Sequence, residues 1–155
     1  MQIQVGDHCP SFRLSSKPGT EIDMASVIGT RKFVLLFMPL AFSPVCTAEV
    51  CTIRDRWTQL QPAGVSVFGI TVDSPFATEK FRVLENLPFP ILSDFNKDVS
   101  RMFGVLHEDL KGMKGLAKRS VFVVNSSGIV TYRWITETPS DQIDFVALES
   151  AVASA

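Results

Sequence analysis

The stretch KFVLLFMPLAFSPVCTAEV, residues 32–50, places the most apolar run of the chain directly before a helix start. Residues 32–39 form a continuous apolar run that a proline ends, which is typical of a strand buried on both faces. Ser43 is suited to the N-cap of a helix, and Pro44 is suited to its first position. The stretch therefore predicts a buried strand, a short connection and a helix.

The same alternation continues along the chain on the C-terminal side. Helices that begin with Ser-Pro are expected over residues 43–61 and 74–87. Strands are expected over residues 65–73 and 89–94. They are followed by a short helix, a hairpin around an NSSG turn and a final helix capped by Ser140 or Asp141, over residues 97–105, 120–135 and 140–155. A βαβ unit followed by a hairpin and a helix predicts the α/β class, as a thioredoxin-like sandwich with a central mixed β-sheet flanked by helices.

Length and composition favour one soluble domain over residues 1–155, because 155 residues with 46% apolar and 20% charged side chains suit a single core. A net charge of −1 gives no reason to expect nucleic acid or a membrane as partner. The longest apolar run, residues 33–42, is about half of what a membrane span needs. The first residues do not resemble a signal peptide, so we expect a cytoplasmic protein with reduced cysteines.

Cys46 is the first candidate for chemistry, since it falls at the third position of the helix that begins after Ser43. At this position a side chain lies beside unpaired backbone N–H groups and the positive end of the helix dipole. Both favour the thiolate, which is the nucleophilic form of cysteine. A small buried hydrophobic residue would fit the same position, so the position alone leaves both interpretations open.

The cysteines match neither a metal site nor a dithiol motif. A structural zinc ion needs four ligands, usually in paired Cys/His units, and Cys46 and Cys51 are not spaced in that way. The two histidines, His8 and His107, are isolated in the sequence. The residue three after Cys46 is Glu49, so the CxxC motif of thioredoxin-type dithiol exchange is not formed there. We therefore expect no bound metal.

The residues around Cys46 carry a more specific signal. Pro39, Ser43 and Cys46 stand in the pattern P-x-x-x-(T/S)-x-x-C, the active-site motif of the peroxiredoxins, and the chain resembles that family along nearly its whole length. Further matching segments are GDHCPSFRL, VFGITVDSP, FPILSD, FGV and KRSVFVVNSSGIV. The resemblance implies a thioredoxin-fold, thiol-dependent peroxidase that uses neither metal nor bound cofactor. Its substrates would be hydrogen peroxide, organic hydroperoxides and peroxynitrite.

The resemblance also implies roles for individual residues. Cys46 matches the peroxidatic cysteine, whose thiolate attacks a peroxide oxygen and becomes a sulfenic acid. Ser43 matches the residue that hydrogen-bonds the thiolate and the peroxide, Pro39 the proline that shields the site, and Arg119 the active-site arginine. Glu49 matches a glutamate that some subfamilies carry. The residues themselves leave simpler interpretations open: a helix cap for Ser43, a solvated strand-edge charge for Arg119 and an exposed helix position for Glu49.

Cys51 is a candidate for the resolving cysteine, because Q-type (bacterioferritin-comigratory) peroxiredoxins often have one five residues after the peroxidatic cysteine. On an intact helix this spacing separates the two Cα atoms by roughly 8–9 Å, whereas a disulfide tolerates at most about 7 Å. The first helical turns would therefore have to unwind before Cys46 and Cys51 could bond. The chain also resembles the AhpE type, in which an external thiol would resolve Cys46 and Cys51 would only pack in the helix. We favour resolution by Cys51.

The expected partners are a peroxide and a thiol reductant such as thioredoxin or a glutaredoxin-like protein. The sequence leaves the preferred peroxide and the choice between monomer and homodimer open, and we expect a homodimer. Two functions of other classes also remain as alternatives. One is a thioredoxin-fold binding module that has lost its chemistry, and the other is a holdase assembly.

Overall fold

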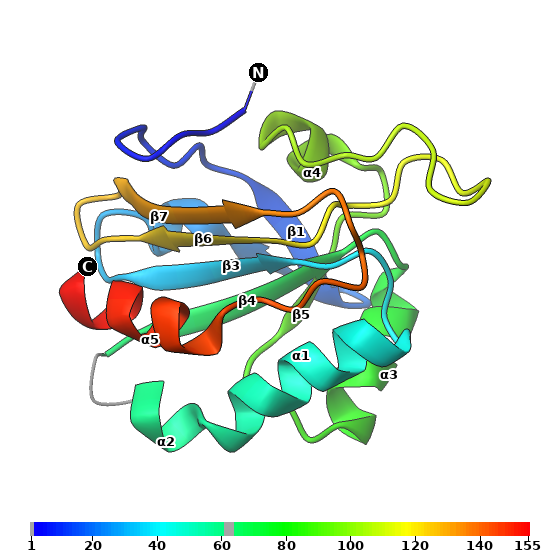
Figure 1. Cartoon of the computed structure of the whole chain (residues 1–155), viewed down its shortest axis with the longest axis horizontal. Coiled ribbons are helices and arrows are strands. Elements are labelled where there is room, and N and C mark those ends of the chain that lie inside the picture. The colour runs from blue at the N-terminus through cyan, green and yellow to red at the C-terminus, as the bar shows by residue number, and fades with distance from the viewer. Residues whose placement is uncertain (1, 61–63) are drawn as a thin grey trace.

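The computed structural model describes residues 2–60 and 64–155, so Gln61, the expected last residue of the first helix, lies outside the described residues. The described residues contain one seven-stranded sheet with the strand order β2-β1-β5-β4-β3-β6-β7 (Figure 1). The strands are β1 (Arg13–Lys17), β2 (Thr20–Asp23), β3 (Phe33–Phe37), β4 (Ser66–Thr71), β5 (Ile91–Ser93), β6 (Ser120–Val124) and β7 (Val130–Ile135). Strands β3, β4 and β5 are parallel neighbours, and the other pairings are antiparallel.

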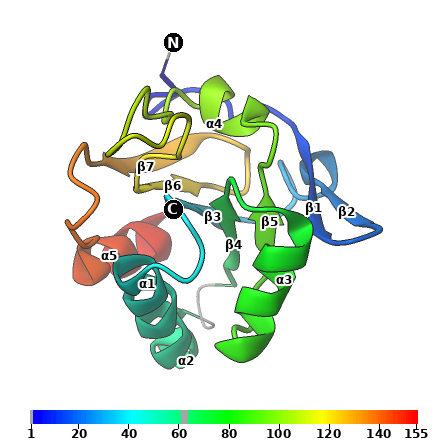
Figure 2. The ribbon, with the colours of Figure 1, turned by 90° about the vertical axis from the view of Figure 1, so that its right-hand side faces the viewer.

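Helices cover both faces of this mixed sheet, which confirms the expected thioredoxin-like α/β sandwich. Figure 2 shows α1, α2, α3 and α5 on one face of the sheet and α4 on the other. The first face carries α1 (Pro44–Asp55), α2 (Trp57–Leu60), α3 (Pro75–Leu84) and α5 (Phe145–Ser154), and the second carries α4 (Asp98–Met102) and the 3₁₀ helix η1 (Met24–Ser26). No helix among residues 2–60 and 64–155 is long and apolar enough to cross a membrane.

Strand β3 lies inside the sheet, between β4 and β6, and every one of its residues is apolar. All five residues of β3 are buried, as are all five of β6 beside it. Val34 and Leu36 point to the core under α1, α3 and α5, whereas Leu35 points to the core on the other face. The continuous apolar run of the sequence thus serves two cores, as expected for a strand covered on both sides.

One hairpin was not predicted from the sequence, and two predicted helix boundaries were wrong. The N-terminal hairpin of β1 and β2 was not expected, because its half-exposed strands lack a clear apolar alternation. Helix α1 ends at Asp55, and Arg56 separates it from α2, although the apolar spacing continues to Leu60. Helix α5 begins after Asp144 rather than near Ser140 or Asp141, because the Asp144 carboxylate accepts a hydrogen bond from the backbone N–H of Ala147 at 3.0 Å.

The strand register brings distant segments to one edge of the sheet. Phe37, the last residue of β3, pairs with Ile70 near the end of β4 and with Ser120, the first residue of β6. Ser120 in turn pairs with Ile135, the last residue of β7. The loop into α1, the residues after β4, Arg119 and the loop after β7 therefore meet at this edge.

Candidate active site

The start of α1 places Cys46 where the sequence predicted it. Helix α1 begins at Pro44, so Cys46 is its third residue, and its side chain is fully buried. The loop before the helix turns sharply at Phe42, whose φ of 68° lies in the left-handed region. The Asp73 carboxylate holds this loop by accepting a hydrogen bond from the Ala41 N–H at 2.7 Å. The Phe42 ring packs against Phe81 of α3 with the ring centroids 5.1 Å apart.

Ser43 is the N-cap residue of α1 by position, but its side chain does not cap the helix. Its hydroxyl donates a hydrogen bond to the Leu40 carbonyl at 2.9 Å instead. The Ser43 carbonyl accepts hydrogen bonds from both the backbone N–H and the hydroxyl of Thr47. The hydroxyl thus fixes the loop that leads from Pro39 to the helix, and the interpretation of Ser43 as a side-chain cap was wrong.

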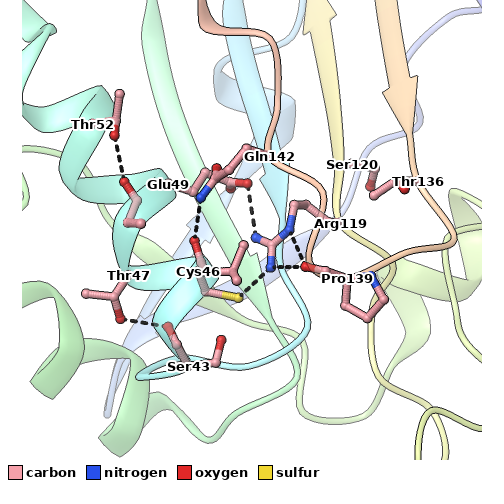
Figure 3. Close-up of polar contacts among 12 residues, drawn as sticks. Ser43, Cys46, Thr47, Glu49, Thr52, Arg119, Ser120, Thr136, Pro139 and Gln142 are labelled. Carbon is pink, nitrogen blue, oxygen red and sulfur yellow. Dashed lines mark hydrogen bonds and ion pairs between the residues drawn. The ribbon is translucent and has the colours of Figure 1, made fainter.

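Arg119 is the centre of the polar contacts around Cys46 (Figure 3). Its Nη2 donates to Cys46 Sγ at 3.3 Å, and its Nη1 donates to Glu49 Oε1 at 3.1 Å. Its Nε and Nη2 also donate to the Pro139 carbonyl, at 3.2 and 3.0 Å. The side chain is only 1% exposed, so the interpretation of Arg119 as a solvated strand-edge charge was wrong.

Glu49 lies one helical turn after Cys46 and completes this buried cluster. Its side chain is fully buried, so the interpretation as an exposed helix residue was wrong. Burial raises the pKa of Glu49 to about 7, although the Arg119 charge and hydrogen bond act in the opposite direction. Burial lowers the pKa of Arg119, but Glu49 and Cys46 outweigh it and raise that pKa above its ordinary value. One permanent cation therefore faces two groups that can each carry a negative charge.

A cavity of about 460 Å³ lies against the start of α1 and the Arg119 side chain. Pro39, Ser43 and Arg119 line it, together with mainly apolar residues from the start of α1, the 110–116 loop and the 138–140 loop. Cys46 is fully buried and does not line the cavity, but Arg119, which contacts its sulfur, does. The predicted site residues Pro39, Ser43, Cys46, Glu49 and Arg119 therefore lie together at one end of α1.

Cys51 is on the same helix but does not face this cluster. It is half-buried, and its thiol donates a hydrogen bond to Glu85 Oε2 at 3.2 Å. Burial raises the pKa of Cys51, and the hydrogen bond to Glu85 raises it further. Cys46 and Cys51 are both free thiols on the continuous helix α1, and they contact different segments, through Arg119 and Glu85.

Cys9, the third free thiol, is buried, and burial raises its pKa to about 12. Such a thiol stays protonated at neutral pH and is a poor nucleophile. Among residues 2–60 and 64–155, no group of three or more histidine, cysteine, aspartate or glutamate side chains is placed to hold a metal ion. The cluster at the start of α1 thus combines a buried ion pair, Arg119 and Glu49, with Cys46, the cysteine that carries the family motif.

Three contacts of the site were not expected from the sequence. The Pro139 carbonyl is a backbone group, so no side-chain pattern could indicate it. Asp73 lies within the VFGITVDSP segment that carries the family resemblance, and its residue type suits a loop contact, but its partner Ala41 is 32 residues away. Glu85 is the C-cap residue that follows α3, and its contact with Cys51 depends on how α1 and α3 pack.

The comparisons with known proteins identify the family of the chain. The AhpC/TSA family model matches residues 5–133. A bcp peroxiredoxin of Coxiella burnetii is 36% identical over 137 residues, which cover 86% of this chain and 89% of that protein. The peroxiredoxin Bcp of Escherichia coli is 37% identical over 106 residues, which cover 68% of this chain and 67% of that protein.

A solved structure gives the same result at the level of the fold. The crystal structure of peroxidoxin BcpB from Mycobacterium tuberculosis superimposes with a TM-score of 0.84 at 28% identity, covering 99% of this chain and 96% of that one. These relatives do not favour a silent binding module or a holdase. The chain therefore belongs to the AhpC/TSA family and is a peroxiredoxin, a thiol-dependent peroxidase that reduces peroxides at the expense of thiols.

Proposed function

We propose that Cys46 is the peroxidatic cysteine and that Arg119, Ser43, Pro39 and Glu49 form its active site. The observation that carries the proposal is the 3.3 Å contact between Arg119 Nη2 and Cys46 Sγ in a fully buried setting. Burial alone would disfavour a charged sulfur. The guanidinium and the helix start supply the opposite charge and the donors that stabilise a thiolate there.

The reaction follows from where the charge moves. The Cys46 thiolate attacks one peroxide oxygen, the O–O bond breaks, and the second oxygen leaves as hydroxide or alkoxide. Negative charge therefore passes from the sulfur to the leaving oxygen, and donors fixed around both stabilise the transition state. Arg119 is held by Glu49 and Pro139, so its donors need little reorganisation during the reaction. The Ser43 hydroxyl would have to turn from the Leu40 carbonyl to contact the peroxide.

We assign hydrogen peroxide, organic hydroperoxides and peroxynitrite as substrates. The mainly apolar cavity beside Arg119 has room for the organic part of a hydroperoxide. Thioredoxin or a glutaredoxin-like protein is the proposed reductant. A homodimer and a cytoplasmic location stay predictions from the sequence.

Cys51 is the proposed resolving cysteine. Once Cys46 becomes a neutral sulfenic acid, it loses the charge that Arg119 stabilises, and the first turn of α1 is held less firmly. Local unwinding of a helix end then brings Cys46 within disulfide distance of Cys51. The resulting disulfide is the form that the reductant would open.

Stopped-flow oxidation of the reduced protein by several peroxides tests this proposal. The wild-type protein should react rapidly, and Cys46→Ser should react no faster than a free thiol. After one equivalent of peroxide, mass spectrometry should show the loss of two hydrogens and a peptide that links Cys46 to Cys51. Rapid oxidation in Cys46→Ser contradicts the assignment of Cys46. A stable sulfenic acid at Cys46 in both wild type and Cys51→Ser contradicts resolution by Cys51 and indicates an external thiol.

A further inference from the structure

The contact between Cys51 and Glu85 is not explained by peroxide reduction at Cys46. Glu85 is the C-cap residue that follows α3, and its carboxylate accepts the hydrogen bond of the Cys51 thiol at 3.2 Å. The Glu85 backbone carbonyl also accepts a hydrogen bond from Arg54 Nη1 at 2.6 Å. The C-cap residue of α3 therefore contacts both Cys51 and the next turn of α1.

The resolving step needs a proton acceptor at this position. A thiol attacks well only as a thiolate, and Cys51 is held in the opposite form. Burial raises the pKa of Cys51, and the hydrogen bond to Glu85 and the negative charges of Glu85 and Asp55 add to the effect, whereas Arg54 opposes it. These are the charged groups that face Cys51 from α1 and from the end of α3. The Cys51 proton therefore has to leave during the attack.

We propose that Glu85 is the general base of the resolving step, taking the proton of Cys51 as this sulfur attacks the Cys46 sulfenic acid. The proposal rests on the assignment of Cys51 as the resolving cysteine. It makes Glu85 a catalytic residue of the second half-reaction, because its carboxylate contacts a reacting sulfur.

The step balances without any further reactant. The Cys51 S–H bond breaks, its proton goes to the Glu85 carboxylate, and its electron pair forms the S–S bond with Cys46. The S–O bond of the sulfenic acid breaks, and the hydroxide that leaves takes the proton from Glu85. One water is released, Cys46 is reduced from the sulfenic to the disulfide level, Cys51 is oxidised to the same level, and Glu85 is ionised again.

The contacts of α1 also indicate which part of the helix moves. The Cys46 turn is held by the Arg119 cluster and by Gln142, whose side-chain amide donates to the Val45 carbonyl at 3.2 Å. The contact of Arg119 with the sulfur weakens when the sulfur becomes neutral, whereas the contacts of Glu85 with Cys51 and Arg54 are unaffected. The Cys46 turn therefore unwinds toward Cys51, and Cys51 stays beside its base.

The experiment separates the two half-reactions in time. Reduced protein is mixed with one equivalent of hydrogen peroxide in a stopped-flow instrument, and samples quenched with acid are analysed by mass spectrometry for sulfenic acid and disulfide. Glu85→Gln should leave the oxidation of Cys46 unchanged and slow disulfide formation about tenfold or more at neutral pH. Glu79→Gln, which neutralises a carboxylate elsewhere on α3, is the matched control and should change neither step.

The dependence on pH distinguishes a base from a structural contact. In the wild-type protein disulfide formation should change little around neutral pH, because the base is built in. In Glu85→Gln its rate should rise about tenfold per pH unit, because the attack then depends on the thiolate fraction. Glu85→Asp keeps a carboxylate and should keep the flat profile.

Two results would overturn the proposal for Glu85 alone: disulfide formation in Glu85→Gln that is as fast as in wild type or faster, and a wild-type rate that itself rises about tenfold per pH unit. The wild-type profile needs no variant, so it decides the matter even if Glu85→Gln does not fold. If the wild-type protein forms no disulfide between Cys46 and Cys51, the assignment of Cys51 is wrong, and the role of Glu85 falls with it.

Discussion

Replacing Glu49 by glutamine tests the charge balance of the buried cluster most directly. Glu49 is fully buried beside Arg119, and its pKa is raised from 4.5 to about 7, mainly by burial. Between these two pH values the folded protein holds the Glu49 proton, and the unfolded chain has lost it. The contribution of this carboxyl to the free energy of unfolding is therefore complete below pH 4.5 and is lost as the pH rises through about 7.

The size of the effect follows from the shift, which corresponds to roughly 3 kcal/mol. Glutamine has nearly the same shape and does not titrate. The free energy of unfolding of Glu49→Gln relative to the parent protein should therefore increase by roughly 3 kcal/mol from about pH 4.5 to above pH 7. Both proteins carry Cys46→Ser, so that the neighbouring thiol contributes to neither stability profile.

Urea unfolding followed by tryptophan fluorescence provides the assay, since Trp57 and Trp134 both pack against the core under α1 and α5. The curves are measured at several pH values for Cys46→Ser and for the double variant. Two stability profiles that run parallel over this range would refute the reasoning, because Glu49 would then have the same proton affinity in the folded and unfolded chain.

Three further variants test the geometry around Cys46. Arg119→Lys keeps the charge but loses the planar fork of donors that contacts Cys46, Glu49 and the Pro139 carbonyl. Oxidation by peroxide should therefore slow about 10²–10³-fold in stopped-flow measurements. An oxidation rate lowered by less than about threefold would contradict this reasoning. Ser43→Ala should lower the free energy of unfolding by about 1 kcal/mol through the lost bond to the Leu40 carbonyl, and it should slow oxidation about tenfold if its hydroxyl contacts the peroxide. Unchanged oxidation would restrict Ser43 to the loop. Asp73→Ala should destabilise the protein by about 1.5–3 kcal/mol in urea, and Asp73→Asn by less, because asparagine can still accept from the Ala41 N–H; equal losses would contradict that role.

The central part of the fold could be predicted because its signals are local. The apolar run before Pro39 indicates β3, the Ser-Pro pair indicates the start of α1, and the NSSG segment indicates the β6–β7 turn, in which the Asn125 side chain accepts hydrogen bonds from the N–H groups of Ser127 and Ile129. The C-terminal end of α1 and the start of α5 were harder to predict from the sequence. The break at Arg56 interrupts a spacing that still looks helical, and three residues near the start of α5 could each cap a helix.

The structure brings the predicted site residues together around Arg119 and the start of α1, but the sequence could not predict their burial or their partners. Arg119 is 70 residues from Glu49, and only the pairing of β6 with β3 brings the two together. The same applies to Glu85, which has no motif around it and matters only because α3 packs beside α1. Burial and partners depend on tertiary packing, whereas residue type and helix position are local.

The backbone at Phe42 has a consequence for the redox cycle. A residue other than glycine in the left-handed region is strained by about 1–3 kcal/mol, and it persists only where its neighbours enforce it. Unwinding of the first turn of α1 would let this residue relax, so the energy held in the loop offsets part of the cost of opening. If Cys51 resolves Cys46, each catalytic cycle would release this backbone strain when the helix start unwinds and restore it when the disulfide is reduced.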